Sequence, residues 1–145
     1  MRVSLSFIPL FDCNTYVYVW KKNPIASESS VSLQELEKYP CLTFDQGKTN
    51  SFYFAEEVFS TYEYKQTIQV DDRASMLNLM VGLNGYTLCS GIICEELNGS
   101  DYAAVPLKET EVMTIGYVKR KSIQLSELAQ LYVNELAKYK KLVLK

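Results

Sequence analysis

Hydrophobic and polar positions change their spacing several times along the chain, and each change predicts a boundary between a strand and a helix. Near the N-terminus, Val3, Leu5 and Phe7 alternate with serines, which predicts a strand over residues 3–10. A second β-prone run covers residues 15–20. Two strands therefore open the chain.

Helices and further strands then alternate. Ser32 and Glu35 form a capping box, so a short helix should begin at Leu33, and Pro40 bars its extension. Further strands are expected over residues 41–44, 65–70, 86–89, 102–107 and 112–118, and further helices from about residue 50, over 71–82, within 92–97 and after Ser126. This alternation predicts an α/β fold.

Two helices have a clear apolar face. Asp71 and Asp72 are suitable N-cap residues for the first, and Gly82 and Gly85 are expected to supply the backbone freedom that ends it. Its core-facing positions should be Met76, Leu77, Met80 and Val81. The terminal helix should bury a stripe of Leu128, Leu131, Tyr132 and Leu136.

Composition limits the class of protein. The 145 residues, 48% of them hydrophobic and 22% charged, fit one globular domain. No apolar run approaches the roughly 20 residues of a membrane helix, and the N-terminus is more typical of a strand than of a signal peptide. The expectation is a soluble cytoplasmic protein without a membrane partner.

The chain holds few groups suited to catalysis or to metal binding. It has no histidine, which excludes Ser-His-Asp and Cys-His sites, and it has no phosphate-binding glycine loop. Its four cysteines are scattered without a zinc-ligand spacing and are expected to be buried, reduced thiols. The net charge of −2 argues against a nucleic-acid surface. We expect no enzyme activity, no metal and no cofactor.

One loop is a candidate binding site. It joins the end of the 41–44 strand to a helix N-terminus, where free amide groups favour a carboxylate or another anion. Asn50 and Ser51 are candidate hydrogen-bond donors, Phe52 a candidate apolar wall and Lys48 a candidate charge, with Gln46 and Thr43 as weaker candidates. The alternative is that Asn50 and Ser51 only cap the helix while Phe52 belongs to the core.

The segment VGLNGYTLCSGII, residues 81–93, resembles the glycine-containing signature near the end of the effector-binding domain of LysR-type transcriptional regulators. Its flanks agree in order with the same family. Residues 16–26 resemble the strand and its basic, proline-containing turn, 32–40 the helix that ends in Tyr-Pro, and 115–120 the closing strand. Asn23 stands where the family often has histidine, at a surface turn position.

The resemblance implies an open α/β fold like that of type 2 periplasmic binding proteins. Residues 1–14 would form a crossover strand from the first subdomain, 15–107 a complete second subdomain, and 108–145 the strand and helix that return to the first. The hinge would lie at Thr15, Tyr16, Val112 and Met113. A DNA-binding domain and the opening half of the first subdomain have no counterpart, which implies an excised piece or a truncated reading frame.

Three functions remain open at this point. The resemblance implies an effector-sensing fragment, in which an anionic or amino-acid-like small molecule biases subdomain closure and DNA is reached only through an absent N-terminal domain. The alternatives are a type 2 solute-binding protein and a ligand-free dimerisation or interaction module. Because the apolar stripe of the last helix must be covered, we also expect self-association.

Overall fold

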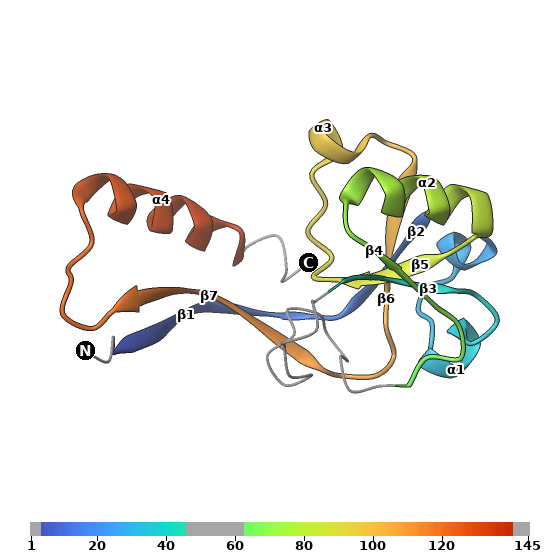
Figure 1. Ribbon diagram of the computed structural model, residues 1–145, viewed down its shortest axis with the longest axis horizontal. Helices are drawn as coiled ribbons and strands as arrows, with labels where there is room; N and C mark the ends of the chain where they lie inside the picture. Colours follow the sequence, from blue (N-terminus) through green and yellow to red (C-terminus); the bar gives the residue numbers. More distant parts are fainter. Residues whose placement is uncertain (1–3, 46–62, 141–145) are drawn as a thin grey trace. The chain divides into compact units, whose positions relative to one another are not determined.

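The computed structural model describes residues 4–45 and 63–140 and divides into two compact units. Unit 1 joins residues 1–13 to residues 112–145, and unit 2 holds residues 14–111 between them. Figure 1 shows the elements in order: β1 (Leu5–Asn14), β2 (Tyr16–Trp20), η1 (Pro24–Ser27), α1 (Leu33–Leu36), β3 (Cys41–Phe44), β4 (Thr67–Val70), α2 (Arg73–Leu83), β5 (Tyr86–Cys89), α3 (Glu95–Asn98), β6 (Tyr102–Pro106), β7 (Val112–Arg120) and α4 (Glu127–Lys138).

Unit 2 is built on a five-stranded sheet with the order β4-β3-β5-β2-β6. The strands β4, β3 and β5 are parallel, whereas β2 runs antiparallel to both β5 and β6. Parallel strands of one sheet need a crossover connection, and α2 supplies it between β4 and β5, which lie on either side of β3. The expected α/β alternation is therefore confirmed in this unit.

The two faces of this sheet carry separate apolar clusters. Alternation along β2 sends Val17 and Val19 to one face, where they pack with residues of η1 and α1. Tyr18 points to the other face, where it packs with Met76 and Met80 of α2. Figure 1 draws α2 on one side of the sheet and α1 on the other. The core of the molecule lies in these two layers.

Local capping explains where the helices begin and end. Ser32 and Glu35 form the predicted capping box, and Asp72 accepts a hydrogen bond from the Ser75 amide at 2.8 Å. The prediction for the end of α2 was wrong. Asn84, with φ of 52°, takes the left-handed position there, whereas Gly82 lies within the helix. An Asn side chain tolerates this conformation, so glycine was not required.

Unit 1 contains a two-stranded antiparallel ribbon of β1 and β7. The Lys121 amide donates to the Ser4 carbonyl at one end, and the Cys13 thiol donates to the Met113 carbonyl at the other. Gly116 allows the two strands to approach, because a Cβ there would lie 2.4 Å from the Ile8 carbonyl oxygen.

The helix α4 begins as predicted, with the Ser126 hydroxyl accepting from the Ala129 amide. The described residues of the single chain leave three of the four positions of its apolar stripe exposed. Leu128, Leu131 and Tyr132 are 78%, 62% and 65% exposed, and Leu136 is half-buried. Helical spacing identifies which side chains share a face, but burial also requires an element to cover that face. No part of the chain that the structure describes covers this one.

Candidate functional site

Three parallel strands of unit 2 end at one edge of the sheet. Phe44 at the end of β3 pairs with Val70 at the end of β4, and the Asp45 amide then donates to the Val70 carbonyl at 2.8 Å. Cys89 ends β5, which runs in the same direction. In open α/β sheets, ligands bind outside the carboxyl ends of such strands. We call this edge, from Val70 to Cys89, the carboxyl edge.

The antiparallel strand β2 begins at the same edge. Tyr16 pairs with Cys89 on one side and with Pro106 on the other. Its ring lies against Gly91, where an added Cβ would be 2.5 Å from the ring carbon Cδ2. Gly91 has φ of +77°, a conformation that favours glycine. The loop after β5 therefore lies close to the point where the chain first passes from unit 1 into unit 2.

Two long-range hydrogen bonds lie beside the points where the chain passes between the units. In unit 2, the Thr15 hydroxyl donates to the Glu111 carbonyl at 2.9 Å. In unit 1, the Cys13 thiol donates to the Met113 carbonyl at 3.4 Å. Burial raises the pKa of the Cys13 thiol, and neighbouring Asp12 adds to the rise, so the sulfur keeps the proton that it donates. Each unit therefore ties the outgoing strand to the returning one.

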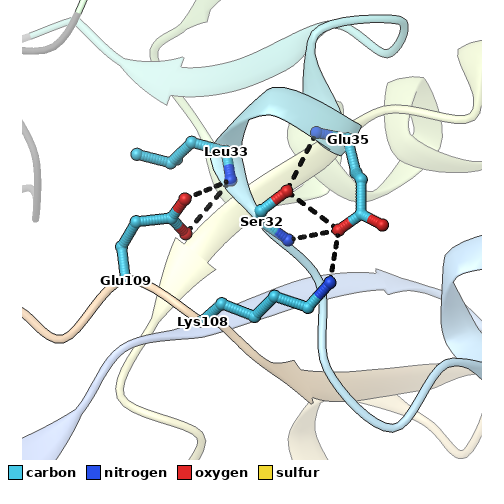
Figure 2. A network of polar contacts seen from close by, with 5 residues as sticks. All are labelled: Ser32, Leu33, Glu35, Lys108 and Glu109. Atoms are coloured by element: carbon cyan, nitrogen blue, oxygen red, sulfur yellow. Dashed lines mark hydrogen bonds and ion pairs between the residues drawn. The ribbon is translucent and has the colours of Figure 1, made fainter.

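A polar network fixes the segment after β6 to α1, as Figure 2 shows. Both carboxylate oxygens of Glu109 accept from the Leu33 amide, at 3.0 and 3.1 Å. The Lys108 ammonium donates to the carboxylate of Glu35 at 2.9 Å, and the same oxygen accepts from the amide of Ser32 at 2.7 Å. The first turn of a helix has free amide groups that favour anions, and Glu109 fills that position.

The charge state of Glu35 follows from this network. The hydrogen bond from Lys108, and then those from Ser32, lower the pKa of Glu35 from its ordinary value of 4.5 to about 2. The side chain is exposed, so bulk water and salt screen the interaction. Glu35 is an anion at every physiological pH.

The structure places some of the predicted site residues. Thr43 lies on β3, one residue before its end, and is half-buried. Gln46, Lys48, Asn50, Ser51 and Phe52 lie outside the described residues. Among the expected hinge residues, Thr15 is 1% exposed, Tyr16 and Met113 are half-buried, and Val112 is 56% exposed.

Several residues near the crossings have a role that the sequence did not indicate. Lys108 and Glu109 belong to a charged turn between two strands, and such turns are usually only solvated. Their partners Glu35 and Leu33 are 73 and 76 residues away, and no local pattern encodes that separation. Gly91 has positive φ and a close neighbour, but only the fold identifies Tyr16 as that neighbour.

The described residues contain no candidate membrane-spanning helix and no candidate metal site. None of the helices in residues 4–45 and 63–140 is long and apolar enough to cross a membrane. Within the same residues, no three cysteine, aspartate or glutamate side chains gather as they would around a metal ion.

Comparison with solved structures identifies proteins of similar fold. HinK, a LysR family transcriptional regulator from Pseudomonas aeruginosa, is 18% identical with a TM-score of 0.69, over 98% of this chain and 50% of that one. The effector binding domain of QuiR in complex with shikimate is 19% identical with a TM-score of 0.61, over 95% of this chain and 66% of that one. The regulatory domain of CcmR from Synechocystis PCC6803 in complex with 2-PG is 16% identical with a TM-score of 0.59, over 97% and 69%.

At these low identities, the TM-scores show a shared fold, the open α/β sheet of type 2 periplasmic binding proteins. The chain spans about half the length of the first solved structures that it matches, 49% and 50%. No curated protein sequence matches it. The family model of the LysR substrate binding domain, however, matches residues 2–141. Because this match covers almost the entire chain, the chain belongs to the LysR substrate binding domain family.

Proposed function

We propose that this chain senses a small organic effector at the carboxyl edge of the unit 2 sheet, and that binding biases the angle between the two units. The single observation that supports this most directly is the convergence of β4, β3 and β5 on one edge, beside the first residue of β2. The polypeptide crosses between the units at that edge, so a ligand there would sit close to both crossing strands.

The chemistry of the edge favours an effector that carries a carboxylate, and an amino acid in particular. Asp45 and Asp71 follow β3 and β4 directly and are exposed, which suits an ammonium group. Lys48, Asn50 and Ser51 in the predicted binding loop would suit a carboxylate. Two of the structurally similar domains are in complex with small molecules, shikimate in QuiR and 2-PG in CcmR.

The two bonds at the crossings support a hinge mechanism. The Thr15–Glu111 bond belongs to unit 2 and the Cys13–Met113 bond to unit 1, so each unit holds both strands as one rigid end. Rotation between the units would then be confined to residues 13–15 and 111–113. Hinge closure around a ligand commonly uses a few such residues between rigid bodies. Binding to DNA would require a further domain. As a regulator of transcription, the protein would act in the cytoplasm.

A thermal-shift screen with L-amino acids and small organic acids at millimolar concentration tests this function. A ligand at about 100 times its Kd should stabilise the fold by roughly 2.7 kcal/mol, which is several degrees in Tm. Asn50→Ala combined with Ser51→Ala, and separately Thr43→Val, should reduce the shift. Thr67→Val, at the opposite end of β4, is the matched control and should leave it unchanged. The absence of any shift, or a shift that survives both site variants, contradicts the proposal.

A further inference from the structure

The chain contains the tripeptide Leu-Asn-Gly twice, at residues 83–85 and 97–99, and both copies lie in unit 2. An asparagine followed by glycine can react with its own backbone in water. The glycine nitrogen attacks the side-chain carbonyl carbon Cγ, ammonia leaves, and a five-membered succinimide ring closes. Glycine favours this ring because it has no Cβ to hinder the approach. Since the two copies share their immediate neighbours, a difference in their reactivity reports their folded surroundings.

The fold holds the first copy rigidly. Asn84 ends α2 in the left-handed conformation, and its carbonyl accepts a 2.9 Å hydrogen bond from the side-chain amide of Asn23, which is buried. Gly85 is buried, and an added Cβ there would lie 3.1 Å from the Leu42 side chain. The next residue, Tyr86, begins β5 and is buried too. Movement of the Gly85 nitrogen towards the Asn84 side chain would therefore disturb the sheet and its close-packed core.

The second copy ends α3, a helix of four residues without a buried side chain. Its N-cap residue Cys94 makes no side-chain capping bond, Leu97 is 84% exposed, and no described atom lies within 4 Å of an added Cβ at Gly99. The Gly99 amide donates to the Glu95 carbonyl at 2.8 Å, a helical bond that restrains its nitrogen while the turn is closed. Helices this short are marginal, so the turn opens at a small free energy without disturbing the sheet.

A side-chain contact connects this turn to α2. The Nε of Arg73 donates to Oδ1 of Asn98 at 3.0 Å, and the bond is exposed, so water can replace it when the turn opens. The same contact determines the surroundings of the product. A carboxylate at position 98 would meet the Arg73 guanidinium in a charge-assisted hydrogen bond, whereas the longer backbone of an isoaspartate would move the carboxylate away from it.

We propose that Asn98 is a site of spontaneous deamidation, and that the fold protects Asn84 from the same reaction. The Gly99 nitrogen gives up its proton and forms a bond to Cγ of Asn98, while the bond from Cγ to the side-chain nitrogen breaks and ammonia leaves with that proton. Water then opens the ring at the side-chain carbonyl to give aspartate, or at the main-chain carbonyl to give isoaspartate, and the new carboxyl group releases a proton. Unit 2 therefore gains one negative charge beside α2 as the protein ages.

Incubation of the full chain at mildly alkaline pH, followed by tandem mass spectrometry, tests this proposal. Both asparagines lie in one tryptic peptide, residues 74–108, so their conversions are compared within the same molecule. In the folded chain, Asn98 should convert faster than Asn84 by on the order of tenfold or more, because its turn opens at a lower free energy. In guanidinium chloride the two rates should agree within about threefold, because both copies are then equally free.

Two variants sharpen the test. Glu96→Gly weakens the helical turn, so conversion at Asn98 should rise roughly threefold. Asn98→Gln is the matched control, since glutamine would need a larger ring; it should abolish conversion at position 98 and leave that of Asn84 unchanged. Equal rates at the two asparagines of the folded chain overturn the proposal, and so does an Asn98 that converts only in guanidinium chloride. A rate that Glu96→Gly leaves unchanged also overturns it, because opening of α3 would then not control the reaction.

Discussion

The hydroxyl of Thr15 donates a 2.9 Å hydrogen bond to the carbonyl oxygen of Glu111, across 96 positions of the sequence. Thr15 is 1% exposed while Glu111 is exposed, so the bond is partly buried and its donor is sheltered from water. It ties the second residue of unit 2 to the last residue of that unit. The bond therefore joins the two ends of unit 2 to one another.

Replacing Thr15 with valine keeps the shape of the side chain and removes this donor. We expect a loss of about 1–3 kcal/mol in the free energy of unfolding, because the Glu111 carbonyl is left without its partner. Urea denaturation measures it. Thr114→Val is the control: its hydroxyl donates to the exposed Asp12 carboxylate at 2.6 Å, where water can replace it. Equal losses in the two variants would show that burial of the Thr15 bond is unimportant.

The carboxylate of Glu35 should make stability depend on acid pH. Its pKa falls from 4.5 in the unfolded chain to about 2 in the fold, mainly because Lys108 donates to it. A lowered folded pKa means that the stabilisation is fully present above pH 4.5 and is lost as the pH falls towards 2. The stability difference between the original chain and Glu35→Gln should therefore shrink over this window.

Lys108→Met is the companion variant for Glu35, since it removes the largest cause of the shift. It should reduce the acid dependence, and adding Glu35→Gln to it should change stability less than Glu35→Gln does alone. Denaturant titrations at several pH values and at low and high salt measure both effects. A pH dependence that is unchanged in both variants would assign it to other carboxylates.

A comparison of alanine variants at Gly91 and Gly99 separates the cost of backbone strain from the cost of steric contact. Both have φ of +77°, and Gly99 has ψ of 169°, so alanine at either position costs about 1–3 kcal/mol of conformational strain. Only Gly91 has a neighbour: an added Cβ would lie 2.5 Å from the Tyr16 ring, while nothing lies within 4 Å of the same position at Gly99. Gly91→Ala should therefore cost roughly 1–3 kcal/mol more than Gly99→Ala, as measured by thermal unfolding. Combining it with Tyr16→Leu should recover part of that excess.

The hydroxyl of Tyr18 is buried and has no hydrogen-bond partner among the described residues. Burial accordingly raises the pKa of Tyr18. Tyr18→Phe should leave stability unchanged or raise it by up to about 1–2 kcal/mol, because an unpaired buried hydroxyl is unfavourable. The control is Tyr102→Phe, whose stacked ring lies 5.4 Å from that of Tyr18 and whose hydroxyl donates to the Leu77 carbonyl. A loss above about 1 kcal/mol in Tyr18→Phe would reveal a partner for this hydroxyl.

The sequence by itself determined the local elements of this protein. The caps at Ser32, Asp72 and Ser126 each use a partner three residues away, so the pattern that encodes them is short and readable. The order of strands and helices, the open α/β class and the family resemblance follow from the same local signals. Of the candidate site, only the position of Thr43 near the end of β3 can be compared with the structure; the loop residues 46–52 remain predictions.

The tertiary structure alone decided which distant groups meet and which surfaces stay open. Glu109 reaches Leu33, and Thr15 reaches Glu111, through pairings that join residues 76 and 96 positions apart. The helix α4 shows the same limit, since its spacing defines an apolar stripe while the described residues leave Leu128 exposed. Helical periodicity depends on neighbours three and four residues away, whereas burial depends on what packs against the helix from elsewhere.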